Sequence, residues 1–138
     1  IDRETGFVGL RRYVSVDDCG RVLDATVVAG QIHGGVTQAM GEALAEAVHY
    51  DPASGQIVTA SFMDYAMPRA MELPAFETHE RPTPCAANPL GLKGVGESGV
   101  TGGLPAIMNA VCDALAAAGV DHLDMPCTPQ RVWRALAG

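Results

Sequence analysis

The segment from Pro82 to Gly103 constrains this chain more than any other part of its sequence. It is rich in proline and glycine along its whole length. Proline cannot donate a backbone hydrogen bond, and glycine weakens both helices and strands. We therefore expect a long loop here. Compact domains seldom carry such loops without a functional reason, so this segment is the first place to search for a site.

The glycines of this segment match a nucleotide-binding motif only formally. Gly94 to Gly99 fit the pattern G-x-G-x-x-G, which requires a buried strand leading directly into the glycines. Pro84 and Pro89 break any such strand. A phosphate-binding P-loop is also disfavoured, because its lysine must follow the glycines and Lys93 precedes them.

A single carboxylate, Glu97, stands among these glycines. Gly94, Gly96 and Gly99 remove side-chain bulk, so that backbone N–H groups can approach a bound group with Glu97 beside it. A carboxylate displayed in this way is suited to act as a general base. The alternative is an exposed acidic residue that caps the following helix, and composition alone favours that alternative.

Composition limits the classes of function. A chain of 138 residues provides for one hydrophobic core, and we expect a single domain over residues 1–138. Nine basic and sixteen acidic side chains leave a formal net charge of −7, which disfavours nucleic acid and anionic lipid as partners. We find no run of about 18 apolar residues and no signal-peptide pattern, so we expect a cytoplasmic protein without membrane insertion.

Two further features concern the origin and the chemistry of the chain. It begins with Ile1 rather than methionine and enters a strand-like stretch at once, as expected of a piece of a longer subunit. The four cysteines are scattered and form no C-x-x-C pair. We therefore expect reduced, mostly buried thiols rather than a metal cluster held by this chain alone.

Hydrophobic patterns predict an α+β fold with a mixed or antiparallel sheet and helices packed on it. Two strands, Phe7–Val16 and Arg21–Val28, are expected to form a hairpin around the turn Asp17–Gly20. The other expected elements are helices over 31–49, 104–118 and 128–136, a turn over 50–55, and strands over 56–62 and 76–81.

Three features allow two interpretations each. Gly34, Gly35 and Gly41 weaken the first helix, which indicates either tight helix packing or a ligand close by. The methionine-rich segment 63–73 is either core filler, which we favour, or the lining of a pocket. His33 is either a cofactor contact or, as we prefer, a hydrogen-bonded structural residue.

Three sequence segments together resemble one known family. They are QIHGGVTQ at 31–38, SFMDYAMPR at 61–69 and NPLGLKGVGESG at 88–99. In this order and spacing they resemble the molybdenum hydroxylases of the xanthine oxidase family, most of all the large subunits of the aerobic carbon monoxide dehydrogenase type. The resemblance covers nearly the whole chain, and it implies the C-terminal, molybdopterin-binding part of such a subunit.

The resemblance also implies roles for individual residues. Glu97 matches the catalytic glutamate beside the molybdenum, which accepts a proton during hydroxylation of an electron-poor carbon. Gln31 matches a glutamine near the pterin dithiolene, and the backbone of Lys93, Gly94, Val95 and Gly96 matches the stretch that passes the metal centre. No residue of this chain is expected to coordinate the metal directly. Cys85 is expected to be a packed thiol rather than a ligand.

Cofactors and partners follow from the same resemblance. It implies a molybdopterin cofactor, with the cytosine dinucleotide form expected, and [2Fe–2S] clusters and FAD on other subunits or domains. We expect the remaining part of the molybdenum-binding subunit and the iron–sulfur and FAD subunits as partners, and self-association of the chain by itself. The isolated chain is expected to hold no cofactor and to be inactive.

Two points stay open at this stage. The substrate is carbon monoxide, an aldehyde, a purine or an N-heteroaromatic compound, since the family acts on all of these and the chain lacks the copper-binding cysteine loop. The competing hypothesis for the function is a non-catalytic assembly module whose glycine loop no longer has a role. Glu97 and Gln31 distinguish the two, because a vestigial loop has no need of this carboxylate and this amide.

Overall fold

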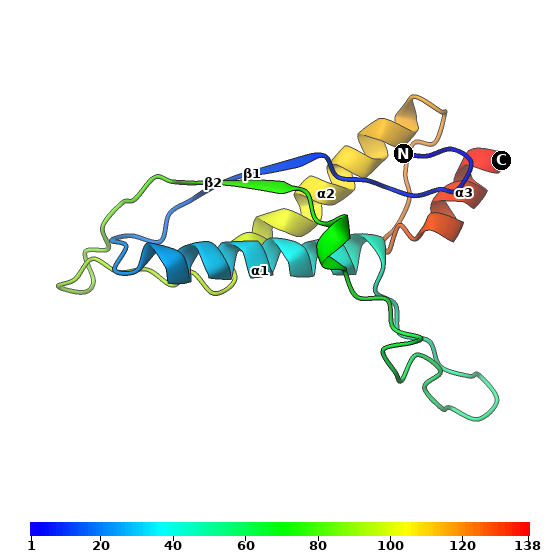
Figure 1. Ribbon diagram of the computed structural model, residues 1–138, viewed down its shortest axis with the longest axis horizontal. Helices are drawn as coiled ribbons and strands as arrows, with labels where there is room; N and C mark the ends of the chain where they lie inside the picture. Colours follow the sequence, from blue (N-terminus) through cyan, green and yellow to red (C-terminus); the bar gives the residue numbers. More distant parts are fainter.

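Two long helices form the centre of the fold. The computed structural model describes residues 1–138, with α1 at Ala25–Leu44 packed against α2 at Ser98–Ala116. The strands β1, Arg12–Asp17, and β2, Ala75–Glu80, lie together along the helices (Figure 1). A short 3-10 turn, η1 at Ala70–Glu72, precedes β2, and α3, Pro129–Ala137, ends the chain. The predicted α+β class is confirmed.

The first helix begins earlier than the sequence pattern indicates. The Asp24 carboxylate accepts hydrogen bonds from the backbone N–H groups of Thr26 and Val27 and so caps α1. The predicted strand Arg21–Val28 is therefore wrong. Its β-branched residues form the first turn of the helix, because the aspartate cap and the burial of Val28 outweigh their strand preference.

The sheet is parallel, so the predicted hairpin and the mixed or antiparallel sheet are wrong. Arg12 pairs with Ala75 at one end of the register and Asp17 with Glu80 at the other. Parallel neighbours require a long crossover, which α1 and the segment after it provide. Tyr13 and Phe76 pack on the helices, whereas Arg12 and Glu77 form an ion pair of 2.6 Å on the open face.

Both predicted C-terminal helices are present. However, α2 begins at Ser98, six residues before the predicted start, so the expected loop over 82–103 is wrong for residues 98–103, where Gly99 and Gly103 pack against α1. The buried residues of α2 recur at steps of four, Gly99, Gly103, Ile107, Val111 and Leu115, and face α1. By length and composition alone α2 could cross a membrane, a test that the core helices of soluble proteins also pass. Thr128 caps α3 by accepting a hydrogen bond from the backbone N–H of Arg131, and Pro129 occupies the first turn, as predicted.

The two long helices touch at glycines. A Cβ on Gly35 would lie 2.9 Å from the backbone nitrogen of Val100 and 3.0 Å from the Cα of Gly99. A Cβ on Gly99 would overlap the carbonyl oxygen of Ile32 and lie 2.9 Å from the backbone nitrogen of Val36. Neither position has room for a side chain, so the glycines set how closely the helices approach.

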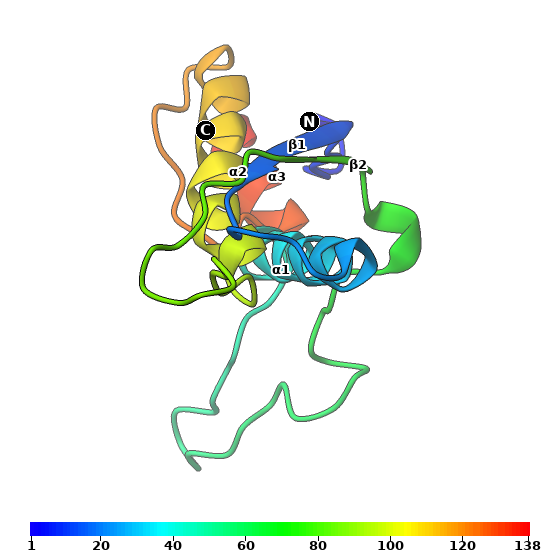
Figure 2. The same cartoon turned by 90° about the vertical axis from the view of Figure 1, so that its left-hand side faces the viewer.

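Residues 45–69 leave the body of the molecule as an extended arm (Figures 1 and 2). A single antiparallel bridge between Tyr50 and Ile57 encloses the turn predicted at 50–55. The predicted strand 56–62 is wrong, because its pairing is limited to this bridge and to a few bonds with residues 49–51, and no strand of the body pairs with it. Phe62 is 87% exposed and Met63 is 93% exposed.

The methionine-rich segment is not core filler. None of its methionines is buried, and Met71 on η1 is 98% exposed. Met67 lines an apolar cavity of about 270 Å³ between the end of α1 and the start of α3. The interpretation as a pocket lining therefore holds for Met67, whereas Met63 and Met71 face away from the body because no other element of the chain reaches them.

The glycine contact between α1 and α2 predicts a sharp difference between two alanine substitutions in α2. Gly99→Ala forces the helices apart and lowers the free energy of unfolding by about 1–3 kcal/mol. Gly102→Ala, whose Cβ would meet nothing within 4 Å, leaves stability unchanged or raises it by up to about 1 kcal/mol. Urea denaturation of both variants measures the difference, and equal stability would contradict the close crossing.

Candidate functional site

The glycine loop is tied to the chain segment that follows β1. Gly20 and Leu92 form an antiparallel bridge. The backbone N–H of Lys93 donates to the carbonyl of Cys19 at 3.0 Å, and that of Arg21 donates to the carbonyl of Gly91 at 2.9 Å. Gly20 and Gly91 both have positive φ, and a Cβ on Gly20 would overlap the Gly91 carbonyl. These contacts set where the loop lies along the body.

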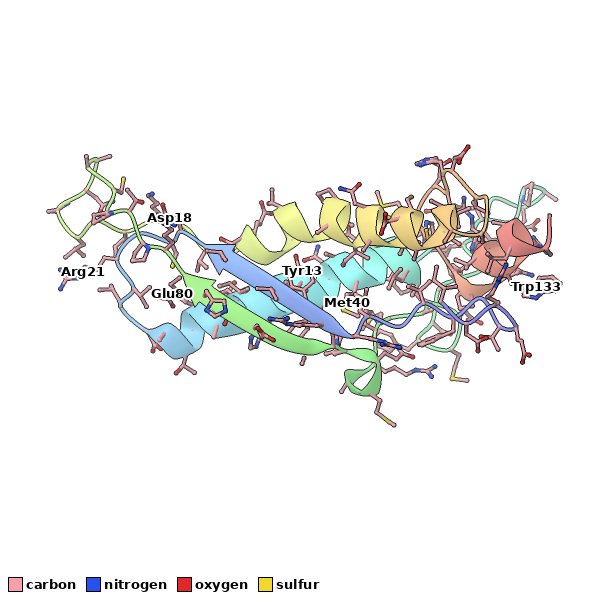
Figure 3. All side chains as sticks on the ribbon, turned by 90° about the horizontal axis from the view of Figure 1, so that it is seen from above. Tyr13, Asp18, Arg21, Met40, Glu80 and Trp133 are labelled. Carbon is pink, nitrogen blue, oxygen red and sulfur yellow. The ribbon has the colours of Figure 1, made fainter.

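The Asp18 side chain accepts three hydrogen bonds at the point where the loop is attached to the end of β1. One carboxylate oxygen accepts hydrogen bonds from the backbone N–H groups of Gly20, at 2.9 Å, and Thr83, at 3.0 Å. The other accepts from the Lys93 ammonium at 2.7 Å. The Lys93 side chain, followed by these backbone donors, holds the pKa of Asp18 well below its usual range. Figure 3 shows Asp18 beyond the end of β1, on the side of the loop.

Asn88 closes the loop internally. Its side-chain amide donates to the carbonyl of Leu92 at 2.9 Å, and the backbone N–H of Leu92 donates to the Asn88 side-chain oxygen at 2.9 Å. This pair of bonds encloses Gly91, whose φ of 71° favours glycine. The loop therefore has a defined shape although it contains neither helix nor strand.

The structure brings Gln31 and the glycine loop together. A Cβ on Gly96 would lie 3.9 Å from the side-chain oxygen of Gln31, so the loop passes directly beside the second turn of α1. The Gln31 side chain is exposed and takes part in no hydrogen bond within the chain. Glu97 follows Gly96 directly in the chain, so its backbone lies close to the same turn of α1. That its carboxylate meets the Gln31 amide stays a prediction.

Glu97 does not act as a helix cap through its side chain. It occupies the N-cap position of α2, yet its carboxylate accepts no capping hydrogen bond. Its backbone carbonyl accepts bonds from the N–H and the hydroxyl of Thr101. The carboxylate is exposed and forms no ion pair, and the Lys93 ammonium is bound by Asp18. The capping interpretation gains no support, and the carboxylate is free for a group from outside.

Several glycines around this face are not required by the packing of the chain. A Cβ on Gly34, Gly94 or Gly102 would meet nothing within 4 Å, and none of these residues has positive φ. Gly41 differs, because a Cβ there would meet the Glu46 and Pro68 side chains. The packing explanation is confirmed for Gly35 and Gly41, whereas no contact within the chain requires Gly34, and a ligand beside it stays a prediction.

The two main cavities of the chain lie away from Gln31 and Glu97. The apolar cavity of about 270 Å³ lies near Met40, toward the other end of α1. A more open cavity of about 520 Å³ lies on the other side of the loop, between Arg21 and Pro89. Neither of these two cavities is lined by Gln31 or Glu97, whose side chains are both exposed.

The remaining candidates take structural positions. His33 stacks on Phe76 with ring centroids 5.1 Å apart, which supports a structural position, but its ring forms no hydrogen bond within the chain, contrary to the expectation. Cys85 is half-buried, and its backbone N–H donates to the Gly91 carbonyl at 3.2 Å. Groups of three or more His, Cys, Asp or Glu residues that could hold a metal ion do not occur.

Sequence reasoning missed Asp18 and Asn88. Asp18 was placed in the turn of a hairpin that does not form, and its actual partners lie 65 and 75 residues further along the chain. The asparagine beside Pro89 was a possible signal, because Asn side chains readily bond to backbone in turns. Nothing in the local pattern shows that Asp18 reaches the loop.

Comparison with known proteins defines the class. Residues 1–74 match the family described as molybdopterin cofactor-binding domain, and the chain belongs to this family. The resemblance to the molybdenum hydroxylases is thereby confirmed. The chain is 43% identical over 136 residues to the carbon monoxide dehydrogenase large chain of Hydrogenophaga pseudoflava, covering 99% of this chain and 17% of that protein.

Other relatives carry different names. The nicotine 6-hydroxylase large subunit of Paenarthrobacter nicotinovorans is 43% identical, with 100% of this chain and 17% of that subunit covered. Among solved structures, carbon monoxide dehydrogenase from Oligotropha carboxidovorans matches with a TM-score of 0.90 and 41% identity, over 98% of this chain and 17% of that one. Quinoline 2-oxidoreductase from Pseudomonas putida 86 matches with a TM-score of 0.87 and 38% identity, over 94% of this chain and 16% of that one. The chain thus spans about one sixth of the length of these proteins.

The Asp18 attachment predicts a pH-dependent contribution to stability. Because the pKa of Asp18 is lower in the folded than in the unfolded chain, its contribution is fully present above about pH 4 and is lost as the pH falls further. Asp18→Asn should therefore be slightly less stable than the wild type at pH 7, since the ion pair is partly exposed, and this small difference should shrink below pH 4. Urea denaturation at several pH values measures this, and a difference that grows toward acid pH would refute the assignment.

Proposed function

We propose that this chain is the C-terminal, molybdenum-cofactor-binding part of a hydroxylase subunit, with Glu97 as its catalytic base and Gln31 as part of the pterin cradle. One observation carries the proposal. Gly96 passes beside the Gln31 amide, the next residue along the chain is Glu97, and neither exposed side chain has a hydrogen-bond partner within the chain. In this proposal residues 1–138 form a single domain that supplies one wall of the active site.

The residues of this face fit a molybdopterin. Exposed backbone at Gly94 and Gly96 carries no side chain that would keep a large, polar ring system away. The Gln31 amide can both donate to and accept from such a group. When bound, the cofactor supplies a redox-active molybdenum centre that takes up electrons from the substrate. Loop backbone from Lys93 to Gly96 and the Gln31 side chain would hold it, in the cytosine dinucleotide form.

Glu97 would take up the proton that hydroxylation releases. An ionised carboxylate without a cation partner is free to accept a proton, and Asp18 keeps the ammonium of Lys93 engaged elsewhere. Lys93 would therefore contribute through its backbone and not through its charge. The first turn of α2 fixes the backbone of Glu97, because the Glu97 carbonyl accepts hydrogen bonds from the hydroxyl and the backbone N–H of Thr101.

The residues of this face do not determine the substrate or the partner subunits. Relatives are named for carbon monoxide, nicotine, quinoline and hypoxanthine, while their common part is the cofactor-binding domain. We propose that the rest of the subunit selects among carbon monoxide, aldehydes, purines and N-heteroaromatic compounds. Iron–sulfur and FAD subunits would receive the electrons, and the complete enzyme would be cytoplasmic. The isolated chain would hold no cofactor and be inactive.

A second candidate function is an assembly module without catalysis. It is favoured by the arm, where Phe62 and Met63 expose apolar side chains that only another surface can cover. The two functions are compatible in one subunit, with the arm contacting the remaining part of the subunit. In the absence of that part we expect the exposed arm to drive self-association of the chain.

Replacement of Glu97 tests the catalytic role in the complete, molybdenum-loaded enzyme. Glu97→Gln keeps the shape of the side chain but cannot accept the proton, so kcat should fall by about 10²–10⁴-fold. Molybdenum content, measured by mass spectrometry, should stay at the wild-type level. Asp113→Asn, which removes another exposed carboxylate of α2, is the matched control and should keep full turnover. Turnover that survives Glu97→Gln would leave the assembly module as the function.

Replacement of Gln31 tests the cradle. Gln31→Ala removes the amide beside Gly96, and the enzyme should retain less molybdenum after extensive gel filtration, because one anchor of the cofactor is lost. Gln38→Ala is the control two turns further along α1, where the amide is already bonded to Glu42 at 3.0 Å. Equal molybdenum retention in the two variants would speak against a role of Gln31 in binding.

A further inference from the structure

We infer that Asp18 is a positioning residue for the glycine loop: through the Lys93 side chain it sets where the backbone of residues 93–96 and the Glu97 carboxylate lie. The inference rests on the proposed function and adds a residue to it. Asp18 itself is placed beyond the end of β1 and is not offered as a group that touches cofactor or substrate. It acts through Lys93.

Three separate segments meet at this one carboxylate. Gly20 belongs to the chain after β1, Thr83 to the chain after β2, and Lys93 to the glycine loop, and each donates to Asp18 at 3.0 Å or less. Both carboxylate oxygens are used, so rotation of the side chain would break at least one bond. The arrangement therefore couples the loop to the ends of both strands of the sheet.

Little else holds the loop between Lys93 and Glu97. Lys93, Gly94, Gly96 and Glu97 are all exposed, and only Val95 reaches the hydrophobic cluster around Ile32. The bridge at Leu92, the Asn88 bonds and the bond from the Lys93 backbone N–H to the Cys19 carbonyl hold the N-terminal end of this stretch. The Lys93 ammonium adds the only side-chain ion pair of the stretch, and this tether joins the loop to Asp18.

The Lys93–Asp18 ion pair should affect the position of the loop more than the free energy of folding. The side chains of Lys93 and Asp18 are 34% and 36% exposed, and ion pairs at such partly exposed positions contribute little to the free energy of folding. A displacement of catalytic groups by about 1 Å, in contrast, can lower a rate by roughly a hundredfold. Loss of the tether should therefore be visible in turnover much more than in unfolding.

The experiment uses the complete molybdenum-loaded enzyme with Asp18→Asn and Lys93→Met. Each should lower kcat by about 10- to 100-fold while KM and molybdenum content stay near the wild-type values. Lys93→Arg, which can still pair with Asp18, should retain more turnover than Lys93→Met. Glu77→Gln is the control, because it removes the Arg12–Glu77 ion pair on the open face of the sheet, away from the loop, and should leave kcat unchanged.

A second readout does not depend on turnover. Hydrogen exchange of the peptide covering residues 83–97, followed by mass spectrometry, should be several-fold faster in Asp18→Asn and Lys93→Met than in the wild type and in Glu77→Gln. Unchanged exchange and unchanged kcat would overturn the inference. Faster exchange with unchanged kcat would also overturn it, since the tether would then be purely structural, as would a fall in kcat that merely follows a loss of molybdenum.

Failure of this inference is distinguishable from failure of the proposed function. If Glu97→Gln keeps full turnover, the catalytic assignment is wrong whatever Asp18 does. If Glu97→Gln abolishes turnover while Asp18→Asn and Lys93→Met leave kcat intact, the proposed function stands and Asp18 has no positioning role.

Discussion

The close contact of α1 and α2 at Gly35 and Gly99 is the constraint on which the rest of this structure depends. It allows the start of α2 to lie directly against the second and third turns of α1, with backbone atoms in contact. Glu97 immediately precedes α2, and Gln31 lies one turn before Gly35. Gln31 and the chain segment that ends at Glu97 therefore lie side by side, because the two helices meet without side chains between them.

The glycine loop adds a second level of order to this helix pair. It has no regular secondary structure, yet backbone bonds to Cys19 and Gly91, the Asn88 bonds and the Asp18 carboxylate give it a defined course. In the C-terminal part of the loop, the backbone of Gly94 and Gly96 is exposed and carries no side chain. Glycine serves opposite purposes here: at some positions it permits contact within the chain, and at others it leaves backbone available to a group from outside.

Sequence periodicity was sufficient for the helices but not for the sheet. The spacing of Val111 and Leu115, like the Thr128 cap, identified helices correctly because these signals are local. The parallel pairing of β1 with β2 could not be predicted, since the partners are about sixty residues apart and the pattern around Asp18 equally suits a tight turn. Resemblance to a known family, and not periodicity, identified Gln31 and Glu97, whereas the tether at Asp18 emerged only from the structure.

The central claim is that the face shared by Gln31 and Glu97 receives the molybdenum cofactor. A crystal structure of the complete, cofactor-loaded enzyme tests it most directly. The account predicts the pterin against the Gln31 amide and the bare backbone of Gly94–Gly96, with the Glu97 carboxylate facing the metal. A cofactor bound elsewhere, for instance against the apolar cavity near Met40, with Glu97 in bulk solvent, would contradict it.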